Sequence, residues 1–249
     1  PGFVKFKREQ LKNIDFVTMV QYEEGLPVNV VFKPIGVEEP LGKVLSDNKI
    51  RQLRIAETEK FAHVTYFFNG GSEEAYPNED RIIVPSLTVD SFADAPQMSA
   101  RGITDKLIEA IKSGNYDFIL LNYANADIVG HTGNEAATVK AAEVIDECLA
   151  EIIPLVLTEG GCLLITSDHG NAEELKNNMT GETNTEHSIN PVPVWLVTKT
   201  NHRKDPLPKE SGEMKVEGLL SDIAPTVLDL LGLEKSKQMT GESLLSFLE

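Results

Sequence analysis

The chain has few cysteines, few basic residues and no long apolar run. Among its 249 residues there are two cysteines, Cys148 and Cys162, and 23 Lys plus Arg against 39 Asp plus Glu, which gives a formal net charge of −16. Two cysteines outside any Cys-x-x-Cys motif exclude a disulfide scaffold, and we expect both thiols to fill the core. No apolar stretch approaches the roughly 20 residues of a membrane-spanning helix. The acidic charge also argues against nucleic acid or an anionic membrane as partner, because both would be repelled.

The common nucleotide-binding loops are missing as well. Neither the Gly-x-Gly-x-x-Gly pattern nor the Gly-x-x-x-x-Gly-Lys-Ser/Thr pattern occurs. Hydrophobic residues make up 41 % of the chain and charged residues 25 %, which is ordinary for a globular protein and excludes a disordered one. We therefore expect a folded, cytoplasmic protein with reduced thiols.

Short apolar runs alternate with helical patterns along the chain. This alternation predicts an α/β fold whose sheet is covered by helices on both faces. Strands are expected at 16–20, 28–32, 62–68, 81–84, 117–123, 161–166 and 193–198. Helices are expected as a pair within 41–58 and at 100–113, 134–157 and 222–231. Sites in such sheets form where strands end, so the residues that follow the strands matter most.

Histidines and aspartates recur at the ends of three predicted strands. In chain order they are Asp127, His131, Asp168, His169 and His187. Carboxylate and imidazole ligands together suit Mn²⁺, Zn²⁺, Fe²⁺ or Co²⁺. Two such ions about 3.5–4 Å apart can hold both the attacking and the leaving oxygen of a transferring phosphoryl group. Each Asp-His group alone could be a turn or capping device, but their recurrence at three strand ends favours a metal centre.

Several other polar residues have two interpretations each. Lys60 is either a phosphate contact near the metals or a solvated lysine at a helix end. His63 is expected in the core or at an interface, and His202 in an exposed loop. A further group supplies either hydrogen bonds around the metal ligands or buried polar packing: Tyr123, Asn125 and Asn171.

Longer motifs run from about residue 14 to the end of the chain. They are Gln52–Lys60, Ala62–Thr65, Phe67–Gly71, Glu79–Arg81, Met98–Ala100, Asn122–Asp127, Gly130–Gly133, Thr166–Glu173, Asn190–Pro193 and Asp222–Thr226. Together they resemble the cofactor-independent phosphoglycerate mutases of the alkaline phosphatase superfamily, and they match only the C-terminal half of that family. The resemblance implies a three-layer α/β/α sandwich with a mostly parallel sheet, incomplete in this chain.

The resemblance also implies an activity and a set of site residues. The family interconverts 3-phosphoglycerate and 2-phosphoglycerate through a phosphoserine, in glycolysis and gluconeogenesis, with two divalent metal ions. Mn²⁺ is expected, with Mg²⁺ or Co²⁺ as alternatives. The first ion would be held by Asp127, His131 and His187 and the second by Asp168 and His169, while Lys60 would contact the substrate phosphate. The substrate is a small molecule, and the full-length protein is expected to be a monomer.

The sequence departs from the family pattern in several places. Ser188 stands where the family commonly has threonine, and 90–97 differs from the usual version. No serine lies in the family's nucleophile context, and Ser167 does not correspond to that serine, so we expect the isolated chain to be inactive. Residues 1–34 are expected to be the tail of the inserted glycerate-binding domain, and 35–249 the C-terminal portion of the phosphatase-like domain. The linker is expected at 34–40, which contains two prolines.

Two alternatives to a phosphoglycerate mutase stay open at this point. One is another enzyme of the same superfamily, such as a phosphopentomutase, a phosphatase or a sulfatase, which a substrate screen would separate. The other is a metal-binding fragment without catalytic activity, which a coupled enolase assay would reveal by the absence of turnover.

Overall fold

The computed structural model describes residues 14–21, 25–33, 36–176, 180–201 and 216–248. The chain divides into two compact units, Pro1–Val37 and Glu38–Glu249. The assignment of residues 1–34 to an inserted domain stays a prediction. Two residues of the expected linker, 34 and 35, and the expected exposed position of His202 lie outside the described residues.

The first unit contains a pair of short strands. Strand β1 (Val17–Val20) and strand β2 (Asn29–Phe32) pair in parallel, with Val17 opposite Asn29 and Val20 opposite Phe32. Most of their residues are exposed. Both strands lie where the sequence predicts them.

The second unit is built around a parallel sheet. Its three strands have the order β4–β3–β5, namely β4 (Glu79–Val84), β3 (Gln52–Glu57) and β5 (Phe118–Leu121). Every residue of the central strand β3 is buried. A two-stranded antiparallel sheet follows, made of β6 (Leu163–Thr166) and β7 (Val194–Val197). The sheets are therefore mostly parallel, as expected.

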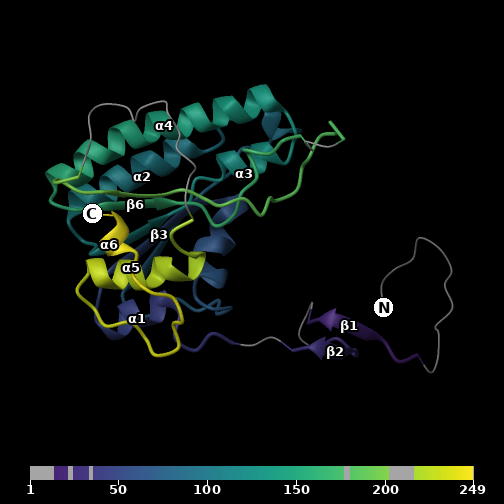
Figure 1. Cartoon of the computed structure of the whole chain (residues 1–249), viewed down its shortest axis with the longest axis horizontal. Coiled ribbons are helices and arrows are strands. Elements are labelled where there is room, and N and C mark those ends of the chain that lie inside the picture. Colours follow the sequence, from purple (N-terminus) through teal and green to yellow (C-terminus); the bar gives the residue numbers. More distant parts are fainter. Residues whose placement is uncertain (1–13, 22–24, 34–35, 177–179, 202–215, 249) are drawn as a thin grey trace. The chain divides into compact units, whose positions relative to one another are not determined.

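Helices cover both faces of the three-stranded sheet (Figure 1). On one face lie α2 (Ala100–Ser113) and α4 (Glu135–Thr158), and on the other α1 (Leu41–Asp47) and α5 (Ile223–Leu230). The short helices α3 (Asn125–Gly130) and α6 (Leu245–Leu248) complete the unit. The three-layer α/β/α arrangement is confirmed.

Each face of the sheet has its own apolar core. The first is formed by β3 residues and by the buried stripes of α2 and α4: Leu53, Ile55, Ile103, Leu107, Ala110 and Ile152. The second joins α1 to α5 through Leu41, Leu45 and Leu228, with Phe118 of β5 packed against them. Apolar residues spaced three or four apart place these stripes on one side of each helix, because an α-helix has 3.6 residues per turn.

Helix boundaries were predicted well where cap residues mark them. Helix α2 spans the predicted 100–113 and ends at Gly114, whose φ of 64° is a left-handed conformation that glycine adopts without strain. Helix α4 begins after Asn134, whose side chain accepts a hydrogen bond from the backbone N–H of Ala137. Both helices differ from the prediction by one residue or less.

Two predicted elements are wrong. Only Leu41–Asp47 of the expected helix pair is helical, and residues 52–57 form β3 instead. The expected strand 62–68 is a π-helical turn, His63–Phe67, preceded by a 3₁₀ turn at Thr58–Lys60. Its β-branched and aromatic residues favour a strand, but local hydrogen bonds hold the turn: the Thr65 hydroxyl donates to the carbonyl of Phe61, and the N–H of Asn69 donates to the carbonyl of Thr65.

Two expectations from the composition concern the cysteines and membrane-spanning helices. Cys148 is buried, as expected, whereas Cys162 is exposed because it lies in the segment that precedes β6. Within the described residues, no helix is long and apolar enough to cross a membrane.

Candidate metal centre

Three strands deliver the candidate residues to one region of the second unit. Strand β3 leads into the turn that ends at Lys60, and β5 leads into α3, which carries Asp127. Strand β6 leads directly to Asp168 and His169. The polar segment that returns to β7 carries His187. Their convergence follows the general rule that sites form beyond the carboxyl ends of strands.

Helix α3 sets the first two ligands. Asp127 and His131 are four residues apart, and the backbone N–H of His131 donates to the carbonyl of Asp127 at 3.0 Å. One helical turn therefore brings both side chains to the same side. Nε2 of His131 lies 3.1 Å from Oδ1 of Asp127.

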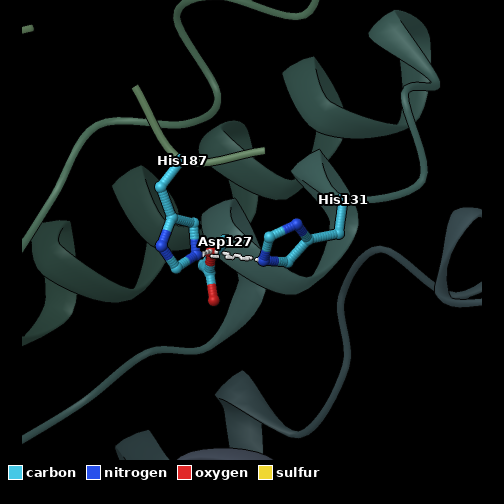
Figure 2. A group of neighbouring side chains, drawn as sticks. All are labelled: Asp127, His131 and His187. Atoms are coloured by element: carbon cyan, nitrogen blue, oxygen red, sulfur yellow. Dashed lines mark hydrogen bonds and ion pairs between the residues drawn. The ribbon is translucent and has the colours of Figure 1, made fainter. Parts of the chain in front are cut away.

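The third candidate ligand closes a triangle of donor atoms (Figure 2). Nε2 of His187 lies 3.2 Å from Oδ1 of Asp127 and 3.1 Å from Nε2 of His131. Two ligand atoms at right angles around one ion, each about 2.1 Å from it, are about 3 Å apart. The three donor atoms, which lie within 4.8 Å of one another, therefore have the spacing that one divalent ion requires.

The hydrogen bonds of His131 fit a ligand role. Its Nδ1 lies 2.6 Å from the carbonyl oxygen of Thr185. A carbonyl can only accept, so Nδ1 carries the proton and Nε2 is left with the lone pair that a metal needs. Ligating histidines usually bond through their second nitrogen in this way.

Asp127 is held ionised by its surroundings. Its Oδ2 forms an ion pair with Lys60, and its Oδ1 accepts a hydrogen bond from Nδ2 of Asn171 at 2.8 Å. Burial opposes ionisation, but the hydrogen bonds from Lys60 and Asn171 outweigh it and lower the pKa of Asp127 below its ordinary value. The Lys60 side chain is only 7 % exposed and that of Asp127 14 %, so Lys60 is not the solvated lysine of the alternative interpretation.

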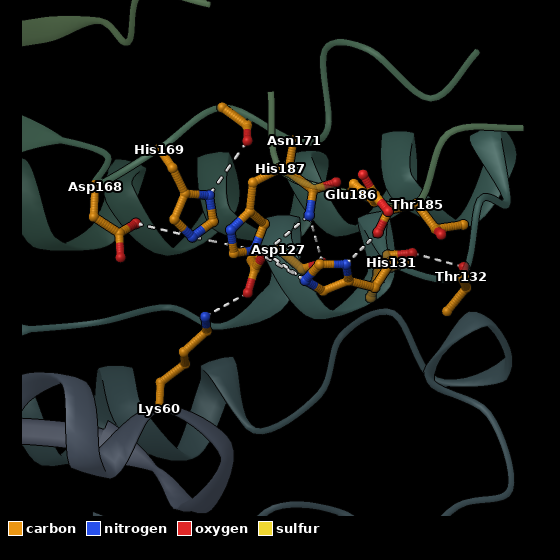
Figure 3. A network of polar contacts seen from close by, with 12 residues as sticks. Lys60, Asp127, His131, Thr132, Asp168, His169, Asn171, Thr185, Glu186 and His187 are labelled. Carbon is orange, nitrogen blue, oxygen red and sulfur yellow. Dashed lines mark hydrogen bonds and ion pairs between the residues drawn. The ribbon is translucent and has the colours of Figure 1, made fainter. Parts of the chain in front are cut away.

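Asp168 and His169 lie beside this triangle (Figure 3). Nε2 of His169 is 3.6 Å from Oδ1 of Asp168 and 3.9 Å from Oδ1 of Asp127. The His169 ring stacks on that of His187, with centroids 3.6 Å apart. The Asp168 carboxylate is more exposed than that of Asp127. The structure thus brings all five candidate ligands into one network.

The remaining polar candidates behave differently from one another. Asn171 contacts Asp127, whereas Asn125 donates to the carbonyl of Pro96 and Tyr123 contacts the hydroxyl of Thr104. The latter two therefore serve packing rather than the ligands. His63 is exposed, so it is not a core residue.

Two contributors were missed by sequence reasoning. The Thr185 carbonyl orients His131, but a backbone group leaves no signal in a sequence. Glu173 contacts Ser188 and the backbone of Asn171. It is the last residue of the Thr166–Glu173 motif, and that position was its only signal.

Comparisons with known proteins agree with this architecture. A family model described as the Metalloenzyme superfamily matches residues 21–235. The chain is 50 % identical to a 2,3-bisphosphoglycerate-independent phosphoglycerate mutase of a Synechococcus strain, covering 98 % of this chain and 46 % of the relative. It is 48 % identical to such a mutase of Methanosarcina barkeri, covering 98 % of this chain and 44 % of the relative.

A solved structure gives the same result. A phosphoglycerate mutase of Leishmania mexicana, studied at low cobalt concentration, superposes with a TM-score of 0.77 at 30 % identity, over 96 % of this chain and 46 % of that one. The chain thus spans less than half the length of the mutases that it matches. The chain belongs to the metalloenzyme superfamily, and nearly all of it is similar to part of the 2,3-bisphosphoglycerate-independent phosphoglycerate mutases.

Proposed function

We propose that this chain is the metal-binding part of a cofactor-independent phosphoglycerate mutase, which interconverts 3-phosphoglycerate and 2-phosphoglycerate. The observation that carries the proposal is the triangle of donor atoms from Asp127, His131 and His187 beside the buried Lys60. The mutase relatives, which match 98 % of the chain, support the choice of substrate class.

In this proposal Asp127, His131 and His187 hold one divalent ion, and Asp168 and His169 contribute to a second. Mn²⁺ suits this mixture of carboxylate and imidazole, with Mg²⁺ or Co²⁺ as alternatives. When bound, such ions polarise a phosphoryl oxygen and neutralise the charge that develops on the transferring group. The protein's own groups prepare the centre for a cation, since Asp127 is ionised and His131 presents a lone pair.

Lys60 supplies a fixed positive charge for the substrate. Its ammonium is buried against Asp127, and a lysine can donate three hydrogen bonds to phosphate oxygens. A phosphate that approaches the metal ligands therefore meets a cation that needs little further ordering. We propose that Lys60 binds the substrate phosphate rather than a metal.

The experiment follows Mn²⁺ binding and then phosphoglycerate binding by the same chain. The EPR signal of free Mn²⁺ should fall as the chain is added, and Asp127→Asn or His131→Ala should abolish this loss. Addition of 3-phosphoglycerate should give binding heat with the Mn²⁺-loaded chain and none with Lys60→Met. A chain that leaves the Mn²⁺ signal unchanged would contradict the metal centre.

The isolated chain is expected to bind without turnover. In a coupled enolase assay, highly purified 249-residue protein should show no mutase activity, because the family's nucleophilic serine has no counterpart among its residues. Turnover that survives Asp127→Asn would indicate a contaminating mutase, whereas turnover abolished by Asp127→Asn would show that this expectation is wrong.

A further inference from the structure

The carboxylate of Glu173 lies between two loops of the metal centre. Its Oε2 accepts a hydrogen bond from the backbone N–H of Asn171 at 2.8 Å. Its Oε1 accepts from the hydroxyl of Ser188 and, at 3.0 Å, from the side-chain amide of Asn190. The first donor belongs to the loop after β6 and the other two to the loop before β7. One side chain therefore joins both loops.

Asn171 and Ser188, which donate to Glu173, are each directly connected to a candidate metal ligand. Asn171, whose backbone is held by Glu173, donates from its side chain to Oδ1 of Asp127 at 2.8 Å. Ser188 directly follows His187 in the chain. Glu173 is thus linked to Asp127 through Asn171 and to His187 through Ser188.

The two loops also meet directly through their backbones. The N–H of Ser188 donates to the carbonyl of Gly170 at 2.9 Å, which forms an isolated β-bridge. A Cβ at Gly170 would collide with Oγ of Ser188 and Oε1 of Glu173. Glycine at this position therefore leaves room for the Ser188 hydroxyl and the Glu173 carboxylate beside the bridge.

Regular structure does little to fix these loops. Between β6 and β7 the described residues contain turns and isolated bridges but neither a helix nor a further strand. Loops of this kind lose conformational entropy when they are ordered, so side-chain hydrogen bonds must restrain them before a ligand can bind tightly.

We propose that Glu173 is a positioning residue, which clamps the loops of His169 and His187 together and so sets the affinity of the metal centre. The inference rests on the proposed metal site. Removal of a group that orients metal ligands typically weakens metal binding about 10–100-fold. Glu173 itself needs no contact with the ion to have this effect.

The first test compares two neighbouring carboxylates. Glu173→Gln replaces one acceptor oxygen by an NH₂ group, which cannot accept from Asn171 or Ser188. Glu174→Gln is the matched control, because it removes the same charge from a carboxylate whose one contact with the described loop donors is with the amide of Asn190. By EPR titration of the full chain, Glu173→Gln should bind Mn²⁺ about 10–100-fold more weakly, and Glu174→Gln close to the unsubstituted chain.

The second test uses the hydroxyl of Ser188. Ser188→Ala removes one hydrogen bond to Glu173, so it should weaken Mn²⁺ binding, but less than Glu173→Gln does. Ser188→Thr keeps the hydroxyl and should bind Mn²⁺ about as tightly as the unsubstituted chain. Both substitutions change the size of the side chain by about one heavy atom, so a general loss of stability would affect both variants. Only loss of the hydroxyl distinguishes Ser188→Ala from Ser188→Thr.

A third readout needs no metal. In EDTA, amide hydrogen exchange within 168–171 and within 186–190 should accelerate together in Glu173→Gln, while the melting temperature changes little. Equal Mn²⁺ affinity in Glu173→Gln and Glu174→Gln, with binding still lost in Asp127→Asn, would overturn the role of Glu173 and leave the metal centre standing. An unsubstituted chain that binds no Mn²⁺ would overturn the metal centre and this inference with it.

Discussion

Asp127 is the residue on which the polar groups of the centre converge. One of its oxygens faces the imidazoles of His131 and His187, and the other pairs with Lys60. Burial of a carboxylate is costly unless it is paired and hydrogen-bonded. The contacts from Lys60 and Asn171 meet that cost and lower the pKa of Asp127. The residue is therefore ready to bind a cation without first losing a proton.

Lys60 should oppose the metal while it favours the phosphate. Lys60→Met keeps a similar shape but removes a positive charge that pairs with Asp127. We expect Mn²⁺ to bind roughly tenfold more tightly, because like charges no longer repel across the site, and 3-phosphoglycerate binding to be lost. Both are measured by titration calorimetry.

Lys106→Met is the control for Lys60→Met, since Lys106 lies on α2 in an exposed pair with Glu109. It should change neither affinity. Weaker Mn²⁺ binding in Lys60→Met would show that the lysine supports the metal ligands rather than the substrate.

Glu57, at the end of β3, should make stability depend on pH. It is buried, and burial raises its pKa above the ordinary value even though Ser86 and the backbone of Ser99 donate hydrogen bonds to it. The folded state therefore holds the proton more tightly than the unfolded state, and stability falls as pH rises through the folded pKa. Glu57→Gln should melt at a higher temperature near pH 7.5 and at a similar temperature near pH 4.

Thermal melts in EDTA measure this effect without interference from metal. Glu59→Gln, two residues on and exposed, is the matched control and should show a much smaller difference between the two pH values, because the charge of Glu59 is the last of the causes that raise the pKa of Glu57. A Glu57→Gln chain that melts lower than the unsubstituted chain at pH 7.5 would indicate that the ionised carboxylate stabilises the fold.

At the scale of elements, β3 explains why part of the fold could not be predicted. Gln52 and Arg54 are fully buried polar residues, so their pattern does not look like that of a buried strand. Gln52 donates to the carbonyl of Gly42 at 2.9 Å, and the Arg54 guanidinium lies 4.3 Å from the centre of the Phe68 ring. These partners come from other elements and appear only once the chain is folded.

The helices were easier to predict because their signals are local. Apolar stripes and the residues at their ends mark α2 and α4 in the sequence itself. Helix α3 was not predicted, although Asp127 and His131, which it brings together, were both expected to be metal ligands. Loop contacts such as that of His131 with Thr185 could not be predicted, because they join residues 54 positions apart.

The N-terminal cap of α4 should matter for stability but not for metal binding. Asn134 accepts a hydrogen bond from the N–H of Ala137, and Asn134→Ala removes it. The loss should cost about 1 kcal/mol in the free energy of unfolding, whereas Asn134→Asp should keep most of the stability. Urea unfolding in EDTA measures both variants, and an Asn134→Ala chain as stable as Asn134→Asp would contradict a capping role.

At the scale of the whole molecule, the net charge of −16 is unfavourable for a phosphorylated substrate. An acidic protein attracts cations and repels anions over most of its surface. Phosphoglycerate binding therefore depends on a local concentration of positive charge, which the metal centre and Lys60 would provide. The same net charge favours the binding of divalent cations.

The α/β class, both layers of helices and the clustering of the five candidate ligands follow from the order of strands and the residues at their ends. The activity that the chain serves does not follow in the same way, since the chain spans less than half the length of its mutase relatives. The metal centre can be tested on the chain itself, because all of its candidate ligands lie within it.

The most direct test is a crystal structure of the chain grown with Mn²⁺, with anomalous data collected above and below the manganese absorption edge. We expect a manganese peak about 2.1–2.3 Å from Oδ1 of Asp127 and from Nε2 of both His131 and His187. Well-ordered density for these three side chains without such a peak, or a peak held by other residues, would contradict the metal centre.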